Sequence, residues 1–366
     1  MLLESIKALN FRNLAGGVSV SDGLNIFVGD NGQGKTNWLE AIYLLASARS
    51  FRTARLQETI RFGEKMGLVR GAVRESPEIV RELKVAIEGP AKQLSINGKK
   101  EPATRYLNQL NAIVFTADSL EIVRGQPEAR RRFLDDGIVS LHPPFIQTFS
   151  DYNRVIRQKN SLLQQAREKE LSLEQISDAL APWNEQLVPL AARIYRGRVR
   201  FVERLNEVLA KHLFGSEDVT VRYVSSLEAH GDVSNYEALI EERLRLRVQA
   251  ETVAGHALIG THRDDLEILF DGRDLRRFGS AGQQRSALLL LLLANIEVLR
   301  VTRGEYPLFL MDDIDAELDY GRIAQLLEYL SGKTQNFATT SKHNFVHEFG
   351  QNAAVFLVEN GQAKLQ

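Results

Sequence analysis

The stretch Gly29-Asp30-Asn31-Gly32-Gln33-Gly34-Lys35-Thr36 decides the class of fold. It follows the apolar segment 24–28 and runs directly into residues 37–43, whose apolar side chains have helical spacing. This is the pattern G-x-x-x-x-G-K-T in the strand–loop–helix setting of a P-loop. Its glycines let successive backbone N–H groups point at phosphate oxygens, and the helix N-terminus faces the same anion. All eight residues are therefore predicted to bind a nucleoside triphosphate.

A second part of the site is predicted at Asp312 and Asp313, which follow the apolar strand 307–311. Lys35 can reach the β- and γ-phosphates, and the Thr36 hydroxyl can ligate Mg²⁺. A buried parallel strand would deliver Asp312 to the same Mg²⁺, and Asp313 would then orient or deprotonate the attacking water. We expect Lys35, Asp312 and Asp313 to be catalytic, with Thr36 and Asp312 as metal ligands. A core strand that ends in a solvated acidic turn is the alternative, and the P-loop in the same chain favours the functional interpretation.

Composition sets limits on the remaining possibilities. The chain has 366 residues, 44% of them hydrophobic, and a net charge of −1, so a DNA-binding surface would have to be a local patch. It contains no cysteine, which excludes disulfides and thiolate metal sites and fits a reducing cytoplasm. The N-terminus predicts no signal peptide, and the apolar run 287–295 is too short for a membrane span, so we expect a cytoplasmic protein and a fully buried helix there.

The order of patterns predicts an α/β head built from both chain ends, with a mainly helical insert. The predicted divisions are 1–125 for the N-terminal part of the head, 126–255 for a helical second lobe and 256–366 for the C-terminal part of the head. The insert has helical periodicity over 128–168 and 172–213, with interruptions expected at Pro143-Pro144 and Pro182, and a further helix over 236–252. Strands are expected at 3–9, 17–20, 24–28, 67–73, 82–87, 93–96, 112–115, 219–224, 266–270, 308–311, 337–340 and 355–358.

A second anion site is predicted at the start of the leucine-rich helix. Ser280 is a good N-cap, and the small residues that follow leave the first helical N–H groups exposed. One phosphate cannot sit at two helix N-termini of one head unless a second subunit supplies one of them. Ser280-Ala281-Gly282-Gln283-Gln284 resembles the signature motif of ABC-type ATPases, in which the signature of one protomer closes over the nucleotide of its twin. The segment Ala316–Asp319 resembles the loop that crosses such a dimer interface.

Taken together, the motifs resemble the bacterial RecF family of recombination-repair proteins over almost the whole chain. The segments that carry this resemblance are Phe11–Leu14, the P-loop, Leu39–Tyr43, Arg49–Arg52, Arg130–Asp135, His262–Leu266, Ser280–Arg285 and Asp312–Asp319. The resemblance implies an SMC-like ATPase head with slow, DNA-stimulated hydrolysis of ATP, and an ATP-dependent homodimer that releases DNA after hydrolysis. It further implies binding to single-stranded gaps or double-strand–single-strand junctions, cooperation with RecR and RecO in loading recombinase, and a place in replication restart and the SOS response.

Carried over by position, Arg12, Asn13, Ser280, Gly282, Gln283 and Asp319 would also contact the nucleotide. A solvated strand end is the alternative for Arg12 and Asn13, and either Arg49 or Arg52 could reach the γ-phosphate or DNA. Thr339-Thr340-Ser341 stands where transporters carry a switch histidine, which suggests slow hydrolysis. Asp118 is a weak candidate for a magnesium-side contact, and the role of His262 is open between a functional element and a packed histidine.

Other functions are less compatible with the chain. A transporter nucleotide-binding domain would have a much shorter separation between Lys35 and Ser280, and a nuclease of the same superfamily would need a further acidic metal cluster. A full SMC protein would need a long coiled coil that 366 residues cannot hold. The DNA-binding face is not located, and the candidates are the arginine clusters at 130–132, 193–200, 243–247 and 276–277, of which 130–132 lies in a family motif.

Overall fold

The computed structural model describes residues 1–169, 172–213 and 216–366, which group into two compact units. Unit 1 comprises Met1–Leu120, Ala281–Gln366 and the described residues of His212–Ser216, and unit 2 comprises Glu121–Lys211 and Glu217–Ser280. Both chain ends therefore build unit 1, as predicted. The boundaries differ from the predicted ones, because residues 121–125 and 256–280 group with unit 2. The main cause is β10 (Asp265–Phe270), which pairs antiparallel with β9 (Val219–Val224).

A six-stranded, mainly parallel sheet positions the nucleotide site in unit 1. Its order is β15-β14-β3-β13-β12-β8, and only β15 runs antiparallel to its neighbour. Every residue of β12 and β13 is buried, which explains why these strands read as continuous apolar or small-residue runs. The strands are β3 (Leu24–Val28), β8 (Ala112–Phe115), β12 (Leu308–Met311), β13 (Asn336–Thr340), β14 (Ala353–Glu359) and β15 (Gln362–Leu365).

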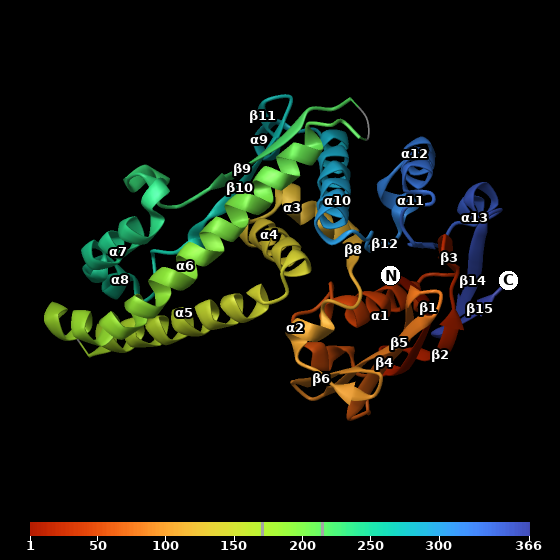
Figure 1. The fold of residues 1–366 in the computed structure, drawn as a ribbon, viewed down its shortest axis with the longest axis horizontal. Helices are drawn as coiled ribbons and strands as arrows, with labels where there is room; N and C mark the ends of the chain where they lie inside the picture. Colours follow the sequence, from red (N-terminus) through yellow and green to blue (C-terminus); the bar gives the residue numbers. More distant parts are fainter. Residues whose placement is uncertain (170–171, 214–215) are drawn as a thin grey trace. The chain divides into compact units, whose positions relative to one another are not determined.

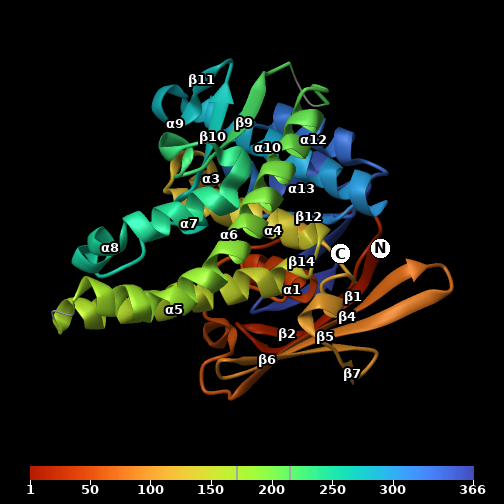
Figure 2. The same ribbon diagram turned by 60° about the vertical axis from the view of Figure 1, so that its left-hand side comes forward.

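A second sheet of unit 1 is antiparallel and has the order β2-β1-β4-β5-β6-β7 (Figure 2). The dipeptide Asn97-Gly98 joins its last two strands with positive φ at both residues, the conformation that a tight two-residue hairpin turn requires. The strands are β1 (Leu2–Phe11), β2 (Leu14–Ser19), β4 (Met66–Ser76), β5 (Ile79–Glu88), β6 (Ala91–Ile96) and β7 (Lys99–Lys100).

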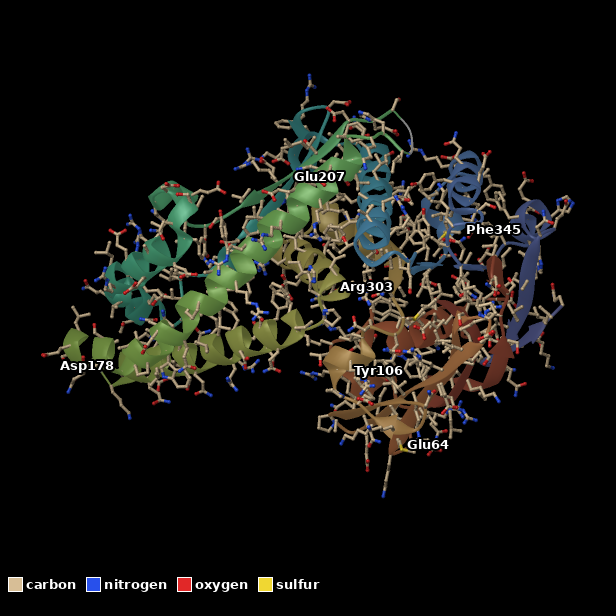
Figure 3. The ribbon with its side chains drawn as sticks, viewed as in Figure 1. Glu64, Tyr106, Asp178, Glu207, Arg303 and Phe345 are labelled. Carbon is tan, nitrogen blue, oxygen red and sulfur yellow. The ribbon has the colours of Figure 1, made fainter. Side chains whose placement is uncertain are left out.

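Helix α1 (Lys35–Ser47) packs against strands of both sheets of unit 1. Because it is covered on two sides, its apolar residues are buried almost all round, including Trp38 and Leu44. Tyr106 of α2 (Ala103–Tyr106) donates a hydrogen bond to the Leu45 carbonyl oxygen and closes one end of this core (Figure 3). The position of α1 fixes the P-loop, since the loop lies between β3 and this helix.

The remaining helices of unit 1 come from the C-terminal part of the chain. In α10 (Ala281–Arg303) every residue of 287–295 is buried, which confirms the prediction from the leucine run. Phe345 of α13 (His343–Phe349) is fully buried and packs edge-on against Tyr320 (Figure 3). The short α11 (Ile314–Glu317) and the longer α12 (Tyr320–Leu330) follow β12.

Unit 2 consists of helices around a three-stranded sheet, β11-β10-β9 (Figure 1). Its long helices α5 and α6 pack side by side and form most of an extended arm. The elements are α3 (Glu121–Arg124), α4 (Pro127–Leu141), α5 (Phe145–Glu168), α6 (Leu173–Leu209), α7 (Tyr236–Leu246), α8 (Val248–Ala254), α9 (Leu275–Phe278), β9, β10 and β11 (Arg273–Asp274). In the described part of the chain no helix has the length and apolar character needed to cross a membrane.

Two sequence expectations for unit 2 are wrong. Pro182 does not interrupt the helical arm, because α6 continues through it. The carbonyl group that loses its partner belongs to Asp178, an exposed residue, so water can take the place of the missing N–H. The helix predicted over 236–252 is in fact two helices, α7 and α8, which meet at Arg247.

Candidate nucleotide-binding site

The P-loop connects the end of β3 to the start of α1. The Lys35 ammonium donates hydrogen bonds to the carbonyl oxygens of Gly29 and Asp30, at 2.7 and 2.9 Å. Two glycines are required by close packing as well as by φ: a Cβ at Gly29 would lie 2.4 Å from the Val358 carbonyl oxygen, and one at Gly34 would lie 2.8 Å from the Asn13 side chain. The loop is therefore closed over its own lysine, and a phosphate would compete for that ammonium.

The two predicted metal ligands lie together. Thr36 donates a hydrogen bond from Oγ1 to Oδ1 of Asp312 at 2.8 Å, across a sequence separation of 276 residues. They meet because β3, β13 and β12 are parallel neighbours, so the residues after β3 and after β12 fall at the same edge of the sheet. A hydroxyl and a carboxylate oxygen are ligands that suit Mg²⁺, which takes few protein ligands and keeps phosphate and water oxygens for the rest. The donor set thus fits the predicted ion.

Asp313 has an unusual backbone conformation beside this pair. Its φ is 49°, in the left-handed region, and its N–H donates to Oγ1 of Thr339 at 2.8 Å. Thr339 in turn donates to Oδ1 of Asp312 at 2.8 Å, so one threonine fixes both acidic residues. A non-glycine residue held in the left-handed region is common at functional sites, since the surrounding contacts must maintain it.

The charges at this edge influence one another. Partial burial, together with the neighbouring carboxylates of Asp315 and Asp312, raises the pKa of Asp313 above its ordinary value. Burial lowers the pKa of Lys35, while the surrounding acids act in the opposite direction. A carboxylate with a raised pKa is better able to accept a proton from water than an ordinary aspartate.

Arg12 and Asn13 are neighbours in the sequence but have different partners in the structure. The Arg12 guanidinium makes a two-point ion pair with Glu40 of α1, through Nε and Nη2, at 2.9 and 2.8 Å. Glu40 is fully buried, and Arg52 also approaches it at 3.5 Å. Asn13 instead contacts the P-loop directly, because its amide donates to the Gln33 carbonyl oxygen and accepts from Asn37. Arg12 therefore secures the helix that follows the loop, and Asn13 secures the loop.

Sequence reasoning did not identify a contact made by the C-terminal hairpin. The turn between β14 and β15 donates the N–H of Asn360 to Oε1 of Gln33 and the N–H of Gly361 to the Gln33 carbonyl oxygen, at 2.7 and 2.8 Å. A Cβ at Gly361 would lie 2.0 Å from the Asn13 carbonyl oxygen. The only signal in the sequence is the Asn-Gly turn itself, which does not indicate its partner.

The second-subunit residues of the predicted composite site lie on several elements. Ser280 is exposed in unit 2, directly before α10, while Gly282 and Gln283 form the first turn of α10 in unit 1. Asp319 caps α12 by accepting from the Arg322 N–H at 2.9 Å. The ion pair between Arg285 and Glu317, at 3.3 Å, joins the signature helix to the turn after β12.

The arginine cluster 130–132 does not form a free basic surface. Arg130 is buried and makes a two-point pair with Asp265, at 2.6 and 2.9 Å. Arg131 donates to the Asp264 carbonyl oxygen at 2.8 Å, and Arg132 pairs with Glu128 on the same helix. The family motif containing these arginines therefore organises unit 2, and its first member is unsuited to contact DNA.

His262 has a structural environment in unit 2. Its Nδ1 lies 2.8 Å from the Tyr152 hydroxyl and its Nε2 lies 3.2 Å from the Ala257 carbonyl oxygen. Burial lowers its pKa to about 4. These contacts support the packed, neutral histidine of the two possibilities that the sequence left open. Asp118 is exposed on the turn after β8, and among the described residues no group of three or more His, Cys, Asp or Glu side chains is arranged to hold a metal ion.

The parallel sheet, the P-loop and the acidic strand end beside it define an ABC-type P-loop nucleotide-binding head with an inserted, mainly helical lobe. The family model for the RecF/RecN/SMC N-terminal domain matches residues 2–364. The protein named DNA replication and repair protein RecF in Lysinibacillus sphaericus is 34% identical over 99% of both chains. The protein of the same name in Pelotomaculum thermopropionicum is 38% identical over 99% of this chain and 100% of its own.

Solved structures agree with these relatives. The structure of the recombination mediator protein RecF-ATPrS in the RecFOR pathway has a TM-score of 0.89 and 29% sequence identity, with coverage of 99% of this chain and 97% of its own. The corresponding RecF-ATP structure has a TM-score of 0.88 at 29% identity, with coverage of 100% and 97%. The chain belongs to the RecF family.

Proposed function

We propose that the chain is a DNA-repair ATPase in which ATP closes a homodimer on DNA and hydrolysis releases it. The observation that carries the proposal is the Thr36–Asp312 contact, which joins the P-loop to the acidic strand end in one site, with Asp313 adjacent. The relatives' names as DNA replication and repair proteins, and the description of RecF-ATP as a recombination mediator, support the same assignment.

In this mechanism residues 29–36 hold the triphosphate, with their N–H groups on the phosphate oxygens and Lys35 transferred from the Gly29 and Asp30 carbonyls to the β- and γ-phosphates. Thr36 and Asp312 would hold Mg²⁺, which supplies charge neutralisation when bound. Asp313 orients the attacking water and accepts its proton. No residue forms a covalent intermediate, so positioning and electrostatics account for the catalysis.

The composite-site residues belong to the same proposal. Ser280, Gly282 and Gln283 of one copy would close over the nucleotide of the other, and Asp319 would lie at the crossing loop between them. The exposure of Ser280, Gly282 and Asp319 supports this role. Slow, DNA-stimulated hydrolysis would then act as a timer, because Thr339 stands where a switch histidine would otherwise contact the γ-phosphate.

We further propose that the substrates are single-stranded gaps and double-strand–single-strand junctions, and that RecR and RecO are partners in loading recombinase. The RecFOR pathway named for the solved relatives supports these partners. A chromosomal DNA substrate implies a cytoplasmic location in bacteria.

Light scattering with a slowly hydrolysed ATP analogue tests the dimer. We expect the wild-type chain to dimerise at micromolar concentration with the analogue, and Asp313→Asn to remain dimeric with ATP itself, since it binds but cannot hydrolyse. Competition among single-stranded, duplex and gapped DNA, with and without ATP and at stated salt, tests the substrate. A chain that stays monomeric with the analogue, or an Asp313→Asn variant with normal turnover, would contradict the mechanism.

A further inference from the structure

Asp315 is a buried acid at the nucleotide site to which the proposed mechanism gives no role. It lies on α11, two residues after Asp313, and its carboxylate is fully buried. Its Oδ2 accepts a hydrogen bond from the Thr340 hydroxyl at 3.0 Å, whereas its Oδ1 is buried without a hydrogen-bond partner in the described part of the chain. A buried, half-satisfied carboxylate is unfavourable for folding, so its presence beside a catalytic acid requires an explanation.

Lys342 completes a clamp around this acid. Its ammonium donates to the Asp315 carbonyl oxygen at 2.7 Å and lies 3.4 Å from the carboxylate. Its backbone N–H donates to Oγ1 of Thr340 at 2.9 Å. The side chain of Lys342 is 53% exposed, yet its charged end is fixed on both the backbone and the side chain of one buried residue. Asp315, Thr340 and Lys342 therefore form one connected unit, here called the Asp315 clamp.

The clamp joins the acidic turn to the strand beside the P-loop. Thr340 is the last residue of β13 and pairs in register with Val28, which directly precedes Gly29. The preceding residue, Thr339, already accepts from the Asp313 N–H, so two consecutive threonines hold the two sides of the turn. Because Asp313 has a left-handed φ, its carboxylate direction depends on such external contacts.

We propose that Asp315 and Lys342 are positioning residues for Asp313, and that opening the Asp315 clamp slows phosphoryl transfer without weakening ATP binding. The inference rests on the proposed ATPase function. In the described part of the chain neither residue makes a hydrogen bond to the P-loop. The charge of Asp315 does act on Lys35, so the test changes Lys342 and leaves Asp315 in place, and ATP binding should then be unaffected. A small displacement of a group that orients the attacking water lowers the rate strongly, because the reacting atoms must be aligned before reaction.

Lys342→Met is the main test, since it removes the ammonium from a half-exposed side chain and keeps the stem. We expect kcat for ATP to fall about ten- to a hundredfold, with the Kd for ATP unchanged within about twofold. Lys342→Arg should retain most of the rate. The matched control is Lys333→Met, because Lys333 is an exposed lysine just before the other end of β13, where its ammonium lies 3.6 Å from the centre of the Tyr329 ring.

Two further measurements separate positioning from a general loss of structure. Hydrogen exchange of the Asp313 amide in the nucleotide-free protein should accelerate in Lys342→Met and not in Lys333→Met. Thr340→Val should lower kcat as well, and its effect should be less than additive with Lys342→Met, because both act through one clamp.

An unchanged kcat in Lys342→Met, equal changes in kcat and ATP affinity, or fully additive effects with Thr340→Val would overturn the inference. If the wild-type chain itself does not hydrolyse ATP, it is the proposed function that fails. If the wild type hydrolyses ATP and Lys342→Met matches it, only the role of the clamp is refuted.

Discussion

Unit 1 and unit 2 both bury charged side chains, but the two units give those charges different partners. At the nucleotide site of unit 1, the Lys35 ammonium is held by two backbone carbonyl oxygens, and Asp313 lies partly exposed in the turn after β12. In unit 2, Arg198 is buried against Asp135 through two contacts of 2.8 and 3.0 Å and donates a third hydrogen bond to the Thr261 carbonyl oxygen.

This difference distinguishes charges that are kept for a ligand from charges that are neutralised within the fold. A lysine that donates its hydrogen bonds to carbonyl oxygens, and not to a carboxylate, can transfer them to an incoming phosphate, so it contributes to binding and transition-state stabilisation. A buried arginine whose Nε, Nη1 and Nη2 all donate hydrogen bonds within the fold cannot bind a ligand without losing interactions that offset its burial. The arginines of a family motif therefore have to be classified by their partners, and Arg130 and Asp135 of the motif 130–135 belong to the charges that are neutralised within the fold.

The largest expected effect is on ATP turnover and comes from Lys35, the charge that unit 1 keeps for a ligand. Lys35→Ala should abolish ATP turnover, by at least about a thousandfold, because it removes the cation that meets the developing negative charge on the phosphates. Folding should change little, since in the described part of the chain the ammonium donates its hydrogen bonds to carbonyl groups that water can also satisfy. Steady-state phosphate release and thermal unfolding, measured on the same preparation, check both parts. A variant that loses activity and stability together would place Lys35 among the structural charges and break the comparison.

The second effect is on the stability of unit 2 and comes from its buried ion pair between Arg198 and Asp135. Arg198→Met should destabilise unit 2 by about 3–5 kcal/mol, since it leaves Asp135 and Asp264 without the positive charge that balances them. Hydrogen exchange of the β9 and β10 amides measures this locally. Arg196, on the same helix as Arg198, makes an exposed pair with Glu237 of α7 and supplies a control, because Arg196→Met should cost at most about 1 kcal/mol. Equal effects of the two variants would show that burial of the pair does not matter.

Much of unit 1 could be predicted from the sequence because its signals are local. The P-loop, the buried strands Leu24–Val28 and Leu308–Met311 and the start of α10 are each encoded by a short run of residues, and each is found where it was expected. The meeting of Thr36 with Asp312 could also be inferred, since carboxyl ends of parallel strands share an edge.

The remaining features depend on pairings between distant residues, which periodicity does not reveal. Residues 256–280 were expected in the head because they resume an α/β pattern, but β10 pairs with β9 of unit 2. The sequence indicates Thr339 only as the replacement for a switch histidine, and its contacts with Asp312 and Asp313 follow from the register of β13. The pairing of Arg12 with Glu40 of α1 is a further example, and its only signal in the sequence is a charged residue within an otherwise apolar helix.

The smallest of the three effects is a pH dependence of unit 2 that arises from His262. The folded protein keeps this imidazole neutral: Nε2–H donates to the Ala257 carbonyl oxygen, and Nδ1 accepts from the Tyr152 hydroxyl. Burial lowers the folded pKa to about 4 from an ordinary value of 6.5. Because the folded pKa is the lower one, the stability is fully present above pH 6.5 and is lost as the pH falls towards 4.

Calorimetric unfolding at pH 8 and at pH 4.5 tests this sign, with the unit 2 transition identified as the one that Arg198→Met lowers. Relative to His262→Gln, whose amide can replace both hydrogen bonds without a proton, the wild type should lose about 2–3 kcal/mol between these pH values. Asp264, whose pKa is raised by burial, acts with the opposite sign, but it is present in both proteins and cancels in the difference. If the difference in unfolding free energy between the two proteins stays constant across this range, His262 takes up a proton as readily in the folded state as in the unfolded state. The interpretation of a neutral, packed histidine would then have to be abandoned.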